Sequence, residues 1–396
     1  MGGKSRARRR QRGGAGPEQR ETGRAQRIAR AVAEHDLTAL KQLARTGDGL
    51  LTTQLRRQAW PLLLNFRSLA DAGDRGAAHR DEDQVALDVR RTRLPDAPEI
   101  RRDVRARRLA ELSQVVSGVL RSYPWLSYYQ GFHELAMTFL CVFGSPRPAV
   151  EAAKMAALFF VRDAMGSSLD HVMQQLDLLY VLLEAACPRV HTLLAALDVP
   201  PFFAISWVLT WFAHDVESFA DVCRLFDHLI VSPPLQVVHV AAALIRLREA
   251  EVLACERDFA AVHTALAALP ATTADWLPVI DGACALQAEY PATKLQHMGA
   301  CRLPRLSAVN THEATWTRLD PARPLAFSSL VPTAAGHPLA SAAPSKEMAR
   351  VIDRTSTAQR ARALALAHRW PLAAATLASA TMLVYAWLVM QQGALA

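Results

Sequence analysis

The stretch FHELAMTFLCVF, residues 132–143, decides the fold class of this 396-residue chain. Its apolar side chains recur every three or four residues, which places them on one face of an α-helix. They are Phe132, Leu135, Ala136, Phe139, Leu140 and Phe143. Gly144 and Pro146 follow, as is usual where a helix ends. The stretch therefore predicts an amphipathic helix with one face in a core.

The helical period continues on both sides of this stretch. Upstream it is kept by Leu109, Leu112, Val116, Val119 and Leu120. Downstream it covers residues 150–163, 168–186, 188–197, 202–215, 218–231, 234–250 and 258–268. Segments with the alternating period of a β-strand are scarce, and the hydrophobic fraction of 51% is that of a globular protein. We therefore predict an all-α fold.

The positive charge of the chain is concentrated in residues 1–30. This segment holds ten Lys and Arg against two Glu, a surplus equal to the net charge of +8 of the whole chain. The remainder is neutral on balance, which argues against nucleic acid as a partner. We predict a disordered basic arm that makes at most a loose contact with acidic lipid headgroups.

At the other end, residues 371–390 contain no charged side chain. At about 1.5 Å per residue, a helix of this length spans roughly 30 Å, the hydrocarbon thickness of a bilayer. Lys and Arg outnumber acidic residues between 346 and 369, which would keep the bulk of the protein in the cytosol. We predict a single-pass transmembrane tail anchor, preceded by a flexible linker over residues 304–369. The alternative is an apolar helix packed on the main domain.

A second informative stretch is VALDVRRT, residues 85–92. Asp88 precedes Arg91 by three residues, so in a helix the carboxylate can orient the guanidinium, while Val85 roots the segment in the core. An arginine held in this way can donate two hydrogen bonds to phosphate oxygens and never loses its charge. The ordinary alternative is a solvated ion pair worth under about 1 kcal/mol. Arg90, next in the chain, leaves the register ambiguous.

The third stretch is Tyr128-Tyr129-Gln130-Gly131. An uncharged glutamine can donate and accept hydrogen bonds, as the orientation of a water molecule requires. Tyr128 can brace Gln130, and Gly131 allows a close approach of the backbone to a partner. These residues can equally be half-buried aromatics and a polar helix start. An arginine and a glutamine are together the side chains that complete a GTP hydrolysis site on another protein, and no nucleotide-binding loop accompanies them.

These stretches resemble the two catalytic motifs of the TBC-domain Rab GTPase-activating proteins. Val85-x-x-Asp88-x-x-Arg91-Thr92 is similar to their I-x-x-D-x-x-R-T motif, with valine in place of isoleucine. Tyr128-x-Gln130-Gly131 matches their Y-x-Q-G motif. The motif spacing selects Arg91 over Arg90.

The resemblance extends to structural positions of the family. They are Arg56, Trp60 and Pro61 of an R-x-x-x-W-P segment, and Arg224 and Asp227 of an R-x-W-D element. Phe226 replaces the usual tryptophan of that element, and His133 replaces an asparagine common after Y-x-Q-G. The similarity covers about residues 48–270, and residues 271–303 would form a helical extension. With the predicted anchor, the chain resembles the tail-anchored branch of the family.

The resemblance implies an all-helical activator that has no substrate chemistry of its own. Arg91 would neutralise charge in the transition state of a Rab, and Gln130 would position the attacking water in place of the Rab's own glutamine. Supporting roles would fall to Asp88, Tyr128, Gly131, Val85 and Thr92. The partner would carry GTP and Mg²⁺, so no cofactor or metal is expected here. The branch implies a Rab of the early secretory pathway and a location on the endoplasmic reticulum or Golgi membrane, with the catalytic domain in the cytosol.

The alternative function is a catalytically silent, membrane-anchored scaffold that binds a Rab. The presence of both Arg91 and Gln130 argues against this scaffold function, because a protein that only binds a Rab has no need of both side chains. Other conspicuous residues have structural interpretations. Arg224 with Asp227 reads as an internal salt bridge, and His214 with Asp215 as structural. The six cysteines lack metal-ligand spacing and read as free thiols.

Overall fold

The computed structural model describes residues 17–66, 77–95 and 101–316, and within them the regular structure is helical, without β-strands. The α-helices are, in chain order, α1 (Pro17–Ala33), α2 (Leu37–Arg45), α3 (Thr53–Leu63), α4 (Glu82–Arg91), α5 (Arg102–Ser122), α6 (Phe132–Phe143), α7 (Pro146–Phe159), α8 (Asp170–Ala186), α9 (Pro188–Ala196), α10 (Ile205–Thr210), α11 (Phe219–Leu229), α12 (Gln236–Leu247), α13 (Glu249–Ala254), α14 (Phe259–Ala268), α15 (Leu277–Glu289), α16 (Ala292–Met298) and α17 (Ala308–Trp316). Two short 3₁₀ helices, η2 (Arg162–Met165) and η3 (Pro201–Ala204), precede α8 and α10. The predicted all-α class is confirmed.

Helix α6 has the bounds that its sequence period predicts. Phe132, Leu135 and Phe139 are fully buried, because the apolar face turns toward the core. The helix ends at Gly144, which adopts a φ of 72°. Only glycine enters this left-handed region without steric cost, so the local sequence determines where the helix ends.

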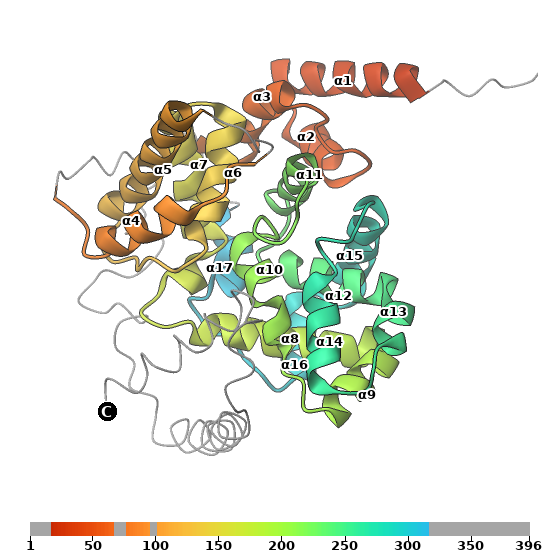
Figure 1. The fold of residues 1–396 in the computed structure, drawn as a ribbon. Coiled ribbons are helices and arrows are strands. Elements are labelled where there is room, and N and C mark those ends of the chain that lie inside the picture. The colour runs from red at the N-terminus through yellow and green to blue at the C-terminus, as the bar shows by residue number, and fades with distance from the viewer. Residues whose placement is uncertain (1–16, 67–76, 96–100, 317–396) are drawn as a thin grey trace, which may run out of the picture.

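The helices form two packed groups joined by α10 (Figure 1). Helices α4, α5, α6 and α7 pack on one another in one group, and α8, α12 and α15 form the centre of the other. The short α10 contacts α6 on one side and α8 and α12 on the other. This arrangement leaves the start of α6 next to the end of α10.

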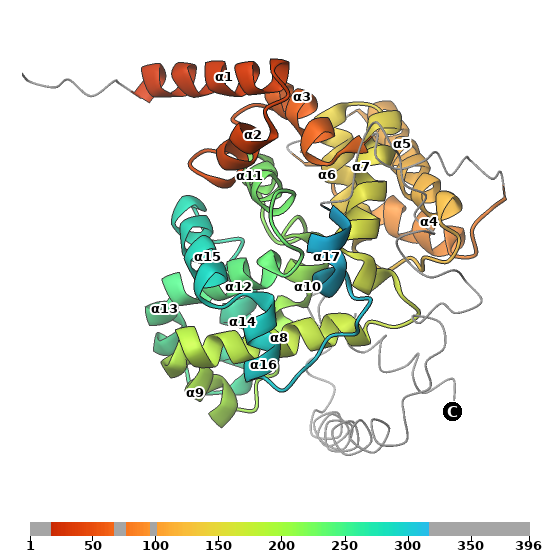
Figure 2. The same ribbon diagram turned by 180° about the vertical axis from the view of Figure 1, so that it is seen from behind.

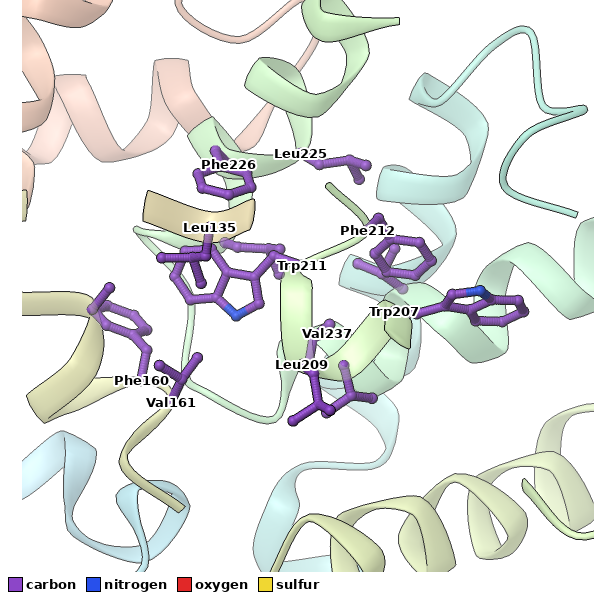
Figure 3. Packing of buried hydrophobic residues seen from close by; sticks show 14 of the residues in the cluster. Leu135, Phe160, Val161, Trp207, Leu209, Trp211, Phe212, Leu225, Phe226 and Val237 are labelled. Carbon is purple, nitrogen blue, oxygen red and sulfur yellow. The ribbon is translucent and has the colours of Figure 1, made fainter. Parts of the chain in front are cut away.

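The core between the two groups is built around Trp211 (Figure 3). Its indole makes edge contacts with Phe160 at 5.5 Å and Phe226 at 5.2 Å between ring centroids. Trp211 and Phe212 have φ values of 53° and 66°, so the helix predicted over residues 202–215 ends at Thr210. The sequence period did not reveal this end, because the tertiary packing of two large rings holds the unfavourable backbone.

The N-terminal arm is shorter than predicted. Residues 17–30 belong to α1, which lies along α2 and α3 (Figure 1). Ile28 and Ala31 are buried against these helices, and Arg24 donates hydrogen bonds to the carbonyls of Gly49 at 2.8 Å and Leu43 at 2.6 Å. Disorder of the whole basic arm was therefore a wrong expectation, since a few apolar contacts and one tethered arginine order its second half.

The linker also begins later than predicted, because residues 304–316 are docked on the domain. Figure 2 shows α17 beside α7. Asp163 accepts a hydrogen bond from the backbone N–H of Ala308 at 2.8 Å. It thereby caps the start of α17, although the two residues are 145 positions apart in the sequence. The Trp316 ring packs on Phe159 and Phe160. Contacts over this distance leave no periodic signal in the sequence.

The predicted transmembrane segment, residues 371–390, lies outside the described residues. Within the described part of the chain, no helix is both long enough and apolar enough to cross a membrane. The cysteines in that part form no disulfide bonds: Cys187 and Cys223 are buried and the others are half-buried.

Candidate functional site

The start of helix α4 is bound to α5, and this contact fixes the position of the residues further along α4. The Arg121 guanidinium donates to both carboxylate oxygens of Glu82, at 2.7 and 2.8 Å. This pairing lowers the pKa of Glu82 to about 2. Val85, one turn further on, is fully buried, as predicted from the sequence. Bidentate pairs of this kind restrict orientation as well as position.

The carboxylate of Asp88 is the centre of the candidate site. Asp88 is fully buried, and its Oδ1 accepts hydrogen bonds from Arg91 and from the Gln84 amide. Its Oδ2 accepts the hydroxyl of Tyr128 at 2.9 Å. One buried carboxylate therefore joins helix α4 to the loop that carries Gln130.

Arg91 is the arginine that this carboxylate orients. Its side chain is 58% exposed although it is bound to a fully buried partner. Arg90 is exposed too, but its side chain has no polar partner within the residues that the structure describes. The geometry therefore distinguishes the two arginines in favour of Arg91. Thr92 closes the helix with a hydrogen bond from its hydroxyl to the Asp88 carbonyl at 3.0 Å.

The loop before α6 is held by the start of α4. Asp81 Oδ2 accepts the backbone N–H of Tyr128 at 2.8 Å. Arg80 donates to the carbonyls of Pro124 and Leu126, at 2.7 and 3.0 Å. These two residues were not predicted, and no motif signals them. They fix the loop from the two positions just before the helix that presents Arg91.

Gln130 lies in the turn before α6 and is half-buried. Its side chain has no hydrogen-bond partner among the described residues, so both its donor and its acceptor groups are free for another molecule. Gly131 has a φ of 119°, and a Cβ there would lie 3.1 Å from Thr210 Cγ2. The backbone conformation and the close packing against α10 thus both favour glycine here, and the predicted approach of the backbone to a partner stays a prediction.

Polar residues of α6 extend the site from Tyr128 toward the surface at His214. The Tyr128 hydroxyl lies 2.8 Å from His133 Nδ1. Glu134 Oε1 lies 3.4 Å from His133 Nε2 and 3.4 Å from His214 Nδ1. Sequence reasoning missed Glu134 and assigned His214 to a merely structural role. The replacement of the usual asparagine by His133 was the available signal.

A second buried carboxylate, Asp227, lies in the core. It accepts Arg56 Nη2 at 2.9 Å, the Trp60 indole N–H at 2.8 Å and the Leu50 backbone N–H at 2.9 Å. We call these four residues the Asp227 centre. Gly49 lies against it, since a Cβ there would approach Asp227 Oδ2 to 2.5 Å. The centre joins α3, α11 and the turn before α3.

The predicted pairing of Arg224 with Asp227 differs from what is observed. Arg224 donates to the carbonyls of Ala44, Arg45 and Gly47 at the end of α2, at 3.0, 3.2 and 2.7 Å. It therefore satisfies free carbonyl groups at a helix C-terminus. Pro61 lies within the last turn of α3, and Phe226 stacks on Trp60 at 6.2 Å between ring centroids. All the predicted structural positions except Pro61 thus serve the contact between α2, α3 and α11.

No group of three or more His, Cys, Asp or Glu side chains that could hold a metal ion occurs in the described part of the chain. The free groups of the site are a guanidinium and a carboxamide. A guanidinium donates hydrogen bonds, and a carboxamide both donates and accepts them.

Comparison with known proteins agrees with this geometry. Residues 53–253 match the family model RabGAP-TBC, the Rab-GTPase-TBC domain. TBC1 domain family member 20 of Mus musculus is 33% identical over 271 residues, which are 67% of each protein. GTPase-activating protein gyp10 of Schizosaccharomyces pombe is 31% identical over 277 residues, 67% of this chain and 72% of the relative. The crystal structure of the Ypt/Rab-GAP domain of Gyp1p shares the fold, with a TM-score of 0.52 and 16% identity over 66% of this chain and 99% of that one. The chain therefore belongs to the Rab-GTPase-TBC domain family.

Proposed function

We propose that this chain, a Rab GTPase-activating protein by its family, completes the active site of a Rab with two side chains, Arg91 and Gln130. The observation that carries the proposal is the shared carboxylate of Asp88. One of its oxygens holds Arg91 and the other holds Tyr128, two residues before Gln130. Arg91 and the loop that carries Gln130 are thereby tied to one buried group, while the side chains of Arg91 and Gln130 remain accessible.

Arg91 would supply positive charge to the transition state. During GTP hydrolysis, negative charge develops between the β- and γ-phosphates, and an arginine from a partner can accelerate the reaction by about 10³- to 10⁵-fold. Such a side chain acts best when it is oriented before the complex forms, because its ordering then costs nothing at the moment of reaction. Asp88 provides this orientation through a hydrogen bond that is fixed by the helix.

Gln130 would orient the attacking water. Its carbonyl oxygen can accept a hydrogen bond from water, and its amide can donate one to the γ-phosphate. The backbone on either side is held in place. Tyr129 donates its hydroxyl to the Leu209 carbonyl at 2.8 Å, and Gly131 packs on Thr210. GTP and Mg²⁺ would belong to the Rab, so the chain itself would need no cofactor.

Activity measurements on a panel of GTP-loaded Rabs test this function. We expect the full-length chain to accelerate single-turnover GTP hydrolysis by at least one Rab, and Arg91→Ala and Gln130→Ala each to abolish most of the acceleration. Arg90→Ala is the matched control, since it removes a neighbouring exposed arginine whose side chain has no polar partner in the described residues. Full activity of both Arg91→Ala and Gln130→Ala would exclude the mechanism. Binding of a Rab without acceleration by the unaltered chain would support the scaffold alternative.

We further infer that residues 371–390 anchor the chain in an early secretory membrane, with the helical domain in the cytosol. The uncharged composition of this segment and the resemblance to the tail-anchored branch support the inference. A tethered activator meets a lipid-anchored Rab on the same surface, so a weak interface suffices. Release of the full-length chain from membranes by alkaline carbonate would contradict a spanning segment. Activity toward Rabs outside the early secretory pathway alone would contradict the assigned membrane.

A further inference from the structure

A network of titratable side chains extends from the Asp88 carboxylate to the surface. Tyr128, His133 and Glu134 follow one another in it, and His214 forms its outer end. His133 is 4% exposed, whereas the side chain of His214 is 45% exposed. The buried end of this network is the Asp88 carboxylate, which holds Arg91 and Tyr128.

The positions of the hydrogen atoms in this network follow from the chemistry of its side chains. An ionised carboxylate can only accept, so the hydroxyl hydrogen of Tyr128 points to Asp88. His133 Nδ1, at 2.8 Å from the same hydroxyl oxygen, must then carry a hydrogen and donate it. His133 Nε2 faces the Glu134 carboxylate at 3.4 Å. The His133 ring therefore lies between a hydroxyl, which it contacts through Nδ1, and a carboxylate, which faces Nε2.

The surroundings of Glu134 favour this arrangement. Burial alone would raise the pKa of Glu134, but hydrogen bonds from His133 and His214 outweigh burial and lower the pKa to about 2. The hydrogen bond with Glu134 also raises the pKa of His214, with further support from Asp215 and opposition from burial and Arg93. The charged groups around this network are thus Asp88 with Arg91 at one end, and Asp215 and Arg93 at the other.

We propose that Glu134, acting through the His133 ring, is a positioning residue for Arg91 and Gln130. The Glu134 carboxylate faces Nε2 and holds the ring in the orientation in which Nδ1 contacts the Tyr128 hydroxyl, and this contact directs the hydroxyl to Asp88. Without the carboxylate the ring can turn, and Asp88 then loses the hydroxyl that ties the two segments together. The inference rests on the proposed function of Arg91 and Gln130.

A double-mutant cycle tests the connection between Glu134 and Tyr128. In the full-length chain, Glu134→Gln and Tyr128→Phe should each lower the single-turnover rate on an activated Rab by up to about 100-fold. The double variant should be no slower than Tyr128→Phe alone, because both changes break the same connection. Affinity for the GTP-bound Rab should change little. Multiplicative effects would overturn the proposal, since a general structural role acts independently of Tyr128.

Two further variants separate positioning from folding. His133→Asn keeps a donor for the Tyr128 hydroxyl and should restore most of the rate that His133→Leu loses. Glu151→Gln is the matched control, because Glu151 pairs with Lys154 on α7 and touches neither Tyr128 nor Asp88. An equal loss in His133→Asn and His133→Leu would contradict the proposal. Thermal unfolding of each variant identifies any that do not fold.

A spectroscopic measurement tests the placement of the His133 ring without any assay of activity. In the full-length chain with ¹⁵N-labelled histidine, the His133 signals, assigned by their loss in His133→Asn, should change in Glu134→Gln and in Tyr128→Phe and stay unchanged in Glu151→Gln. Unchanged His133 signals in Glu134→Gln would overturn the proposal, whatever Arg91 does. Full activity of Arg91→Ala would instead remove the proposed function on which the positioning role rests.

Discussion

Two fully buried aspartates, Asp88 and Asp227, are used in opposite ways by this protein. Each accepts a hydrogen bond from an arginine and from an aromatic side chain. The arginine of Asp227 is Arg56, whose side chain is 5% exposed, whereas the arginine of Asp88 is 58% exposed. The first arrangement joins segments of the core. The second presents a cation to solvent in a fixed orientation.

The difference lies in where the charge of the arginine is satisfied. Arg56 has no access to water, so removal of Asp227 would leave an unpaired buried charge. Arg91 can be hydrated when Asp88 no longer holds it, so its ion pair contributes little to stability. We therefore expect changes at the Asp227 centre to affect folding and changes around Asp88 to affect catalysis. The predictions below test this separation.

The largest effect is expected for Arg91→Ala. The variant should lose about 10³- to 10⁵-fold in accelerated GTP hydrolysis, because the transition-state charge is no longer neutralised. Its free energy of unfolding should change by less than about 1 kcal/mol. Single-turnover hydrolysis and urea unfolding followed by tryptophan fluorescence measure the two quantities. A large loss of stability would show that Arg91 also supports the fold.

Asp227→Ala should have the opposite profile. We expect its free energy of unfolding to fall by about 3–5 kcal/mol, because the Arg56 guanidinium stays buried without its partner. If this variant does not fold, Trp60→Phe removes a single indole donor and should cost about 1.5–3 kcal/mol. Urea unfolding measures both. The folded fraction should keep its rate of GTP hydrolysis, and a selective loss of that rate would break the separation.

Asp88→Asn is an intermediate case. The amide keeps the shape of the side chain but lowers its capacity to accept from both Arg91 and Tyr128. The rate of GTP hydrolysis should fall by up to about 100-fold. The stability loss should stay near 1 kcal/mol, because Arg91 can turn to water. Single-turnover kinetics and urea unfolding of this variant measure the two effects. A stability loss as large as that of Asp227→Ala would contradict the proposed difference between Asp88 and Asp227.

The smallest effect concerns pH and the neighbour of Asp227 on α11, His228. Burial, with Arg224 and Arg45 nearby, lowers the pKa of His228 from 6.5 to about 3. The unfolded chain binds a proton here below about pH 6.5 and the folded chain does not. Stability is therefore present above that pH and is lost as the pH falls toward 3. Between pH 7 and pH 5 the loss should be about 2 kcal/mol.

Urea unfolding at both pH values measures this loss, and His228→Gln should reduce it. An unchanged difference in the variant would assign the acid sensitivity to other groups. The Asp88 side of the molecule behaves in the opposite sense. The pKa of His214 is raised, chiefly by its hydrogen bond with Glu134, so its contribution is full below pH 6.5 and is lost as the pH rises through the raised pKa.

The two aspartates also show which parts of the site were predictable. Asp88 precedes Arg91 by three residues on one helix, with the acid on the N-terminal side, and the predicted pair forms. Arg224 and Asp227 have the same spacing in the reverse order, and each finds other partners. The favourable order agrees with the helix dipole, since Arg91 lies in the last turn of α4. Spacing alone was not sufficient.

The parts of the fold that the sequence did not reveal depend on contacts between distant segments. Helix α17 is ordered by Asp163 and by aromatic contacts to α7, and α1 by contacts that reach Gly49. Neither segment has a marked apolar period, so both were assigned to disordered or flexible regions. The contacts of His133 and Glu134 were not predicted for a similar reason, because their partners come from different segments.

The sequence by itself determined the helical class, the bounds of α6 and the local pair of Asp88 with Arg91. These features depend on residues three or four apart, whose proximity is fixed by the geometry of the helix. Only the tertiary structure decided that Tyr128 would reach Asp88, that Arg56 would reach Asp227, and that Glu134 would lie between two histidines. The partner of a buried polar group is set by which helix faces pack together, and that packing depends on the whole core.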